Sequence, residues 1–120
     1  MKLIDDKNFA NFAFVTPKGN PHVSPVWIDR DGDTIQINSA ENCAKSKLLK
    51  ENQKVMISIM NQKNPYERVL IRGHIIEITK KGAEEQNNKM SVKYLGTIED
   101  PGRPVSDRVL FKIEADRILE

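Results

Sequence analysis

The sequence predicts a mainly β protein, a single domain over residues 1–120 built as a six-stranded antiparallel barrel with two helices. Two observations lead to this class. Stretches typical of β-strands fill most of the first two-thirds of the chain, and two of them carry apolar side chains on both faces. A half-exposed antiparallel sheet would alternate apolar and polar side chains. Two apolar faces therefore indicate that one lines a barrel and that the other meets a helix or a second subunit.

Three strands are predicted at the start of the chain, over residues 11–16, 22–29 and 34–38. Residues 17–20 (Pro-Lys-Gly-Asn) separate the first two and have the composition of a turn. Asp31-Gly32 separates the second from the third and is typical of a hairpin. We therefore expect an antiparallel meander of three strands.

Five further elements follow: a helix over 41–52, strands over 54–60 and 66–78, a helix over about 80–95, and a strand over 108–114 that could extend to residue 119. Ser39 or Asn42 is expected to cap the first helix. Thr79 is expected to cap the second, and Gly96 fits its end. Residues 100–104 are predicted to form a loop.

Composition and charge exclude several classes of function. Lys and Arg number 19 against 17 Asp and Glu, a net charge of +2, and the basic residues are not clustered. This balance is not that of a protein that binds nucleic acid or an anionic membrane. A membrane span needs about 20 apolar residues, and the sequence has neither such a run nor a signal peptide. We therefore expect a cytoplasmic protein.

The start of the first predicted helix concentrates positive charge. Lys45 and Lys47 lie where the unpaired backbone N–H groups of a helix already favour an anion. The polar residues just before them supply further hydrogen-bond donors. One interpretation is a phosphate site, and the other is two solvated lysines on a surface helix. Residues two apart point to different sides of a helix, so both reach one phosphate only if it lies near the axis.

Two further segments are candidates for ligand contact. Pro25 lies inside a predicted strand, and because proline cannot donate to a sheet ladder it belongs at an edge or a bulge. The backbone groups of Ser24, Pro25 and Val26 can then meet the polar edge of a flat ring, or Pro25 simply protects an edge. The loop over 61–66 sets Tyr66 beside polar groups, and an ordinary connection is the alternative.

Sharper catalytic patterns are missing from the sequence. His22 and Ser24 share a strand face, but no third group indicates a triad. His22 and His74 have no metal-ligand spacing, so no metal site is predicted. Cys43 is interpreted as a small packed residue, although a helix start can lower a thiol pKa.

The ordered series of segments resembles the pyridoxamine 5′-phosphate oxidase-like flavin-binding split barrels. Residues 18–27 (KGNPHVSPVW) are similar to the segment after the family's first strand, and residues 44–49 (AKSKLL) to its phosphate-binding helix. Asn64-Pro65-Tyr66 and Arg72-Gly73 also have counterparts. The similarity covers nearly the whole chain and is greatest to the subgroup that uses FMN or the deazaflavin coenzyme F-420.

This resemblance implies a split β-barrel that forms a homodimer with two cofactor sites at the interface. It assigns the phosphate to Lys45 and to Lys47, which stands where the family usually has arginine. The other cofactor contacts that it implies are Asn38, Ser39, Ala40 and Cys43 along the phosphate and ribityl chain, Ser24, Pro25 and Val26 against the ring, and Met60 and Asn61 at the neighbouring strand end.

The function implied is an oxidoreductase that transfers a hydride between FMN or coenzyme F-420 and a small organic substrate. Because the cofactor carries the chemistry, no catalytic side chain is predicted, and Tyr66 is the candidate for substrate contact. The alternatives are a non-enzymatic carrier of a flavin, heme or tetrapyrrole, and a structural dimer with an empty cleft. The acidic tail of the deazaflavin would need a basic groove, for which the candidates are Arg68, Arg72, Arg103 and Arg117.

Overall fold

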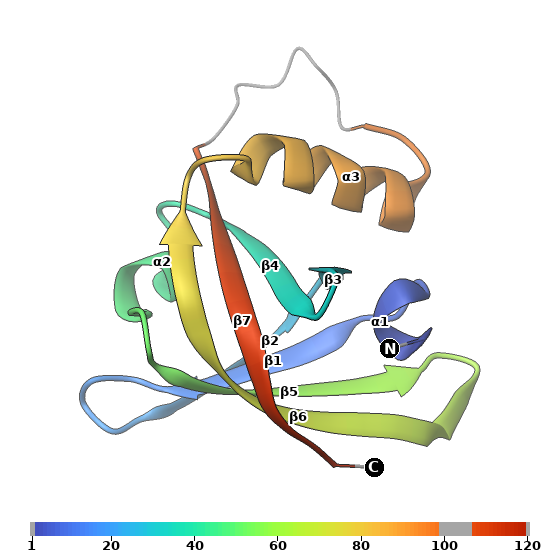
Figure 1. The fold of residues 1–120 in the computed structure, drawn as a ribbon, viewed down its shortest axis with the longest axis horizontal. Helices are drawn as coiled ribbons and strands as arrows, with labels where there is room; N and C mark the ends of the chain where they lie inside the picture. The colour runs from blue at the N-terminus through green and yellow to red at the C-terminus, as the bar shows by residue number, and fades with distance from the viewer. Residues whose placement is uncertain (1, 99–106, 120) are drawn as a thin grey trace.

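A computed structural model describes residues 2–98 and 107–119 as one curled antiparallel sheet with three helices (Figure 1). The strands are β1 (Ala10–Val15), β2 (Pro21–Val26), β3 (Asp29–Asp31), β4 (Thr34–Ala40), β5 (Lys54–Asn61), β6 (Asn64–Thr79) and β7 (Arg108–Leu119). The helices are α1 (Lys2–Asp5), α2 (Ala44–Leu48) and α3 (Ala83–Leu95). The strand order is β2-β1-β5-β6-β7-β4-β3.

The short link between β2 and β3 forces the sheet to curl. These strands lie at opposite ends of the strand order, yet only Trp27 and Ile28 separate them. Seven flat strands would set β2 and β3 about 29 Å apart at the usual spacing. The chain from Val26 to Asp29 can reach at most about 11 Å. The two ends of the sheet therefore approach each other, which confirms the predicted mainly β split barrel.

The predicted meander is wrong at its second strand. Residues 22–29 do not form one strand, because β2 pairs with β1 whereas β3 pairs with β4. The backbone N–H of Ile28 donates to the hydroxyl of Tyr94 (3.1 Å) instead of to a neighbouring strand, and the Ile28 side chain is fully buried. This corner divides the predicted strand, so the described residues form seven strands rather than six.

The helices also differ from the prediction. The helix expected over 41–52 spans only Ala44–Leu48, and its N-cap is Cys43, without a side-chain hydrogen bond, rather than Ser39 or Asn42. It stops at Leu49, which is extended and buried in the core.

The other predicted helix, α3, begins at Ala83 after a left-handed Gly82 rather than at a Thr79 cap. The hydroxyl of Thr79 instead accepts a hydrogen bond from the N–H of Lys81 (3.0 Å). Gly96 does end α3, with φ 80°. The short helix α1 was not predicted, and the loop over 100–104 lies outside the described residues.

The core fills the inside of the curled sheet. Phe12, Ile57 and Ile71 are directly paired on neighbouring strands and are at most 1% exposed. Their neighbours along the strands point outward, as shown by Met60 and Leu70, which are 50% and 40% exposed. α3 lies across one end of the barrel (Figure 1). No helix in the described part of the chain is long and apolar enough to span a membrane.

Candidate functional site

A pocket of about 500 Å³ lies between β2, β4, α3 and the start of α2, and we call it the β2–β4 pocket. It brings together most of the residues predicted for a cofactor. Its lining consists of Phe9, Pro25, Val26, Trp27, Asn38, Ser39, Ala40, Cys43, Lys45, Asn87, Met90 and Arg108.

Two cations line this pocket, and we call the surroundings of Lys45 and Arg108 its cationic end. Lys45 lines it, and the Lys45 ammonium donates to the hydroxyl of Ser24 on β2 (3.4 Å). Arg108, the first residue of β7, lines it as well. Because α2 has only five residues, the anion site predicted at its start depends on these side chains more than on a helix dipole. Lys47, by contrast, is exposed and outside the lining.

Asn38 fixes the position of Arg108 in the pocket wall. The Asn38 side-chain carbonyl accepts a hydrogen bond from Nε of Arg108 (2.8 Å). Its amide donates to the backbone carbonyl of Ala83 (2.7 Å) and to Oε1 of Gln86 (2.9 Å), both on α3. Asn38 therefore ties the start of α3 to β4 and orients a guanidinium toward the pocket.

Cys43 lies in the same wall and has an unusual acidity. Its sulfur is 2.6 Å from the Ser39 hydroxyl and 3.6 Å from that of Ser46. Burial acts to raise the pKa of the thiol, but hydrogen bonds with the Ser39 side chain and with the backbone and side chain of Ser46, together with the charge of Lys45, outweigh it and lower the pKa from 9.0 to about 7. Near neutral pH, a substantial share of Cys43 is therefore thiolate.

Aromatic side chains line the pocket as well, and we call the surroundings of Phe9 and Trp27 its aromatic end. Trp27 stacks on Tyr94 with ring centroids 5.1 Å apart and planes at 3°, and Phe9 lies 5.6 Å from the same tyrosine. Phe9 and Trp27 line the pocket, and Phe9 is 50% exposed. Ser24 and Trp27 are three residues apart, about 10 Å of extended chain. The residue that contacts Lys45 is thus close along the chain to the aromatic residue Trp27.

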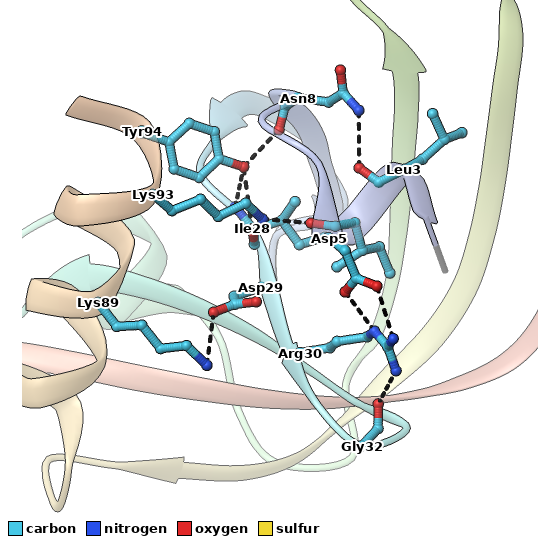
Figure 2. A network of polar contacts seen from close by, with 11 residues as sticks. Leu3, Asp5, Asn8, Ile28, Asp29, Arg30, Gly32, Lys89, Lys93 and Tyr94 are labelled. Carbon is cyan, nitrogen blue, oxygen red and sulfur yellow. Dashed lines mark hydrogen bonds and ion pairs between the residues drawn. The ribbon is translucent and has the colours of Figure 1, made fainter. Parts of the chain in front are cut away.

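Hydrogen bonds hold the aromatic end in place (Figure 2). The Tyr94 hydroxyl donates to the backbone carbonyl of Asn8 (2.6 Å) and accepts from the N–H of Ile28 (3.1 Å). Burial raises the pKa of Tyr94, which keeps the hydroxyl protonated as a donor. The ammonium of Lys93 donates to the carbonyls of Ile4 and Ile28, and burial lowers its pKa. Together these bonds clamp α3 to the corner that carries Trp27.

Three other predicted residues lie apart from this pocket within one chain. Met60 follows Ile59, which pairs with Ala10 of β1, and the Met60 side chain is half exposed. The Asn61 amide donates to Glu67 (3.2 Å) in the β5–β6 hairpin. Tyr66 is 89% exposed and lines a different pocket of about 680 Å³.

Sequence reasoning did not assign five residues of the lining to the pocket: Phe9, Trp27, Asn87, Met90 and Arg108. Arg108 is the first residue of β7 and pairs with Ala40 of β4. This pairing joins distant segments, so the local sequence pattern could not predict it. Phe9 precedes β1, and Trp27 was recognised only as part of the segment 18–27. Among the described residues, no group of His, Cys, Asp and Glu could hold a metal ion.

The four arginines considered for an acidic tail are distributed over the molecule. Arg72 and Arg117 line a third pocket of about 810 Å³. Arg68 lines the pocket that contains Tyr66. Arg103 lies outside the described residues. None of the three described arginines lines the β2–β4 pocket.

Solved structures with the same fold are similar over nearly the whole chain. A structure described as F420 Reductase is 24% identical with a TM-score of 0.87, and the match covers 98% of this chain and 94% of that chain. HupZ from Group A Streptococcus is 22% identical (TM-score 0.70; 98% and 86% covered). General Stress Protein 26 from Bacillus anthracis is 18% identical (TM-score 0.69; 98% and 86% covered). At these identities the likeness shows the fold alone.

The sequence itself identifies the family. No protein with a curated description matches the sequence. The profile of the family described as Pyridoxamine 5′-phosphate oxidase, however, matches residues 1–120. The chain therefore belongs to the pyridoxamine 5′-phosphate oxidase family.

Proposed function

We propose that the β2–β4 pocket binds FMN or the deazaflavin coenzyme F-420, and that the protein is an oxidoreductase acting on a small organic substrate. Membership of a flavin-related oxidoreductase family supports the general class. One observation carries the specific proposal: two cations, Lys45 and Arg108, line the same pocket as the aromatic side chains of Phe9 and Trp27. Both cofactors join a phosphate to a flat ring, so a pocket lined by both cations and aromatic rings suits them.

The residues of the pocket fit the parts of such a cofactor. Lys45 and Arg108 supply positive charge for the phosphate, and Arg can hold two of its oxygens at once. Ser39 and Ala40 follow on β4, along the path between the two ends. Pro25 and Val26 are on β2, the edge strand of the sheet, where one row of backbone groups faces away from β1. These groups can meet the polar edge of a ring.

When bound, the cofactor supplies hydride transfer. The side chains of this chain bind and orient it, and the apolar wall of Phe9, Trp27 and Met90 keeps water from one side of the ring. The proposal needs no acid or base from the protein. It therefore assigns no catalytic residue, and Tyr66 remains the proposed substrate contact.

We also infer that the protein acts as a homodimer with the cofactor at the interface. Met60, Asn61 and Tyr66 do not reach the β2–β4 pocket within one chain, so a second copy would have to supply them. Phe9 in the pocket lining and Met60 outside it are each 50% exposed and provide apolar surface for such a contact. Met60→Asp is expected to yield monomers in light-scattering chromatography and to weaken cofactor binding. A stable dimer with normal cofactor binding would contradict this inference.

Trp27 provides a direct test, because it is the only tryptophan of the chain and lines the pocket. Saturable quenching of its fluorescence by FMN or coenzyme F-420 is expected, and no quenching by either would refute the proposal. Substrate-dependent reoxidation of the reduced cofactor then identifies an enzyme. Tight binding without turnover would instead identify a carrier of a flavin, heme or tetrapyrrole.

A further inference from the structure

Another pocket, distinct from the β2–β4 pocket, gathers positive charge over an apolar floor. It encloses about 810 Å³ and shares no lining residue with the β2–β4 pocket. We call it the arginine pocket. Its lining consists of Ala13, Phe14, Val15, Pro21, His22, Val23, Gln53, Lys54, Val55, Met56, Arg72, Gly73, Asp116 and Arg117.

Strand pairing places its central residues in one row on the outside of the barrel. Ala13 pairs with Met56, Met56 with Arg72, and Arg72 with Arg117. The next row along the strands contains Ile57, which is fully buried in the core. Because side chains alternate between faces, the row with the two arginines points outward.

The two arginines are direct neighbours of like charge. Residues paired across antiparallel strands have Cβ atoms about 5 Å apart, and like charges at such positions are destabilising. Lys54, on the adjacent strand, lines the same pocket. No carboxylate in the described part of the chain lies within 4 Å of these three cations. An anion in the pocket would offset the repulsion.

A β-bulge in β7 brings both Asp116 and Arg117 to the wall of this pocket. Arg72 pairs with Arg117 and Gly73 with Ala115, so Asp116 is an extra residue in β7. Consecutive residues of a regular strand face opposite sides, yet Asp116 and Arg117 both line the pocket, as expected at a bulge. Bulges of this kind re-aim side chains and are frequent beside binding sites.

One further contact fixes the bulge, and another holds the Asp116 carboxylate away from the two arginines. A Cβ on Gly73 would lie 2.5 Å from the backbone oxygen of Glu114, so only glycine permits this close approach of β6 and β7. The carboxylate of Asp116 is engaged by Nδ1 of His74 (2.9 and 3.0 Å). It is thus turned to the histidine rather than to Arg72 or Arg117.

We propose that the arginine pocket binds an organic anion, a carboxylate or sulfonate carried on an apolar body. Arg72 and Arg117 supply paired donors whose fork geometry matches a planar carboxylate. Ala13, Val15, Val23 and Met56 supply the apolar surface for the rest of the molecule. The proposal does not depend on the cofactor assigned to the β2–β4 pocket.

The test uses a matched pair of fluorescent probes, the anionic 8-anilinonaphthalene-1-sulfonate and its neutral counterpart N-phenyl-1-naphthylamine. The wild type is expected to bind the sulfonate saturably, with one site per chain and at least tenfold more tightly than the neutral probe. Arg72→Gln and Arg117→Gln should each weaken the sulfonate at least tenfold and leave the neutral probe within twofold. Decanoate should displace the sulfonate, whereas decanol should not.

Arg68→Gln is the control, because Arg68 is exposed on the same strand but outside this pocket. It should leave sulfonate affinity within twofold, and thermal melting should show that all variants fold. Equal affinity for the two probes, an equal loss in Arg68→Gln, or no saturable binding would overturn the proposal. Saturating FMN should not displace the sulfonate, and competition between them would show that the probe reads the β2–β4 pocket instead.

Discussion

Lys45→Ala is predicted to weaken the binding of FMN roughly tenfold. The Lys45 ammonium lines the cationic end of the β2–β4 pocket and lies 3.4 Å from the Ser24 hydroxyl. A charge-assisted hydrogen bond contributes about 1.5–3 kcal/mol. Lys45 is partly exposed, so water screens its charge and the lower end of this range applies. About 1.5 kcal/mol corresponds to a tenfold change in Kd, and Arg108 would retain the remaining affinity.

The assay is a titration with FMN, followed by the quenching of Trp27 fluorescence. Lys50→Ala is the matched control, because Lys50 is exposed close by in sequence but does not line the pocket. Raising the salt concentration should reduce the affinity of the wild type more than that of Lys45→Ala, since the interaction is between charges. Identical Kd values for the wild type and Lys45→Ala, or an equal loss in Lys50→Ala, would refute the reasoning.

Three further predictions concern Cys43, Tyr94 and Gly73. The rate of Cys43 alkylation by iodoacetamide should rise with pH about a midpoint near 7, because the folded protein lowers the thiol pKa to about 7; a midpoint near 9 would contradict this. Tyr94→Phe should lower the free energy of unfolding by about 1–3 kcal/mol in urea, because the buried N–H of Ile28 loses its acceptor, and an unchanged midpoint would argue against the clamp. Gly73→Ala should cost about 1–3 kcal/mol by overpacking against Glu114, seen as a lower Tm, whereas an unchanged Tm would show that β7 can move aside.

The strands were predictable where their signal is local. Val55, Ile57 and Ile59 share one face of the strand predicted over 54–60, and all three are buried in the core. The corner between β2 and β3 has no such signal. It depends on a hydrogen bond from Ile28 to Tyr94, 66 residues away in the chain, which no pattern within a single segment contains.

The same distinction applies to the pocket. The charge at Lys45 and the proline at position 25 were visible in the sequence, and the structure brings both to one pocket. Arg108 was not visible, because its place in the wall follows from the pairing of β7 with β4. The extent of α2 was overestimated because the predicted helix over 41–52 included Leu49, which is buried in an extended conformation.

The corner at Trp27 and Ile28 links the closure of the barrel to the shape of the β2–β4 pocket. Tyr94 and Lys93 anchor Ile28 by hydrogen bonds. Trp27, the residue just before Ile28, belongs to the aromatic end of the pocket and stacks on the same Tyr94 ring. The hydroxyl of Tyr94 therefore anchors the corner, whereas its ring supports Trp27. Tyr94→Phe keeps the ring and should reduce stability with little effect on FMN, whereas Tyr94→Ala removes the stacking surface and should weaken FMN as well. Equal FMN affinity in the two variants would show that the aromatic end does not hold the ring.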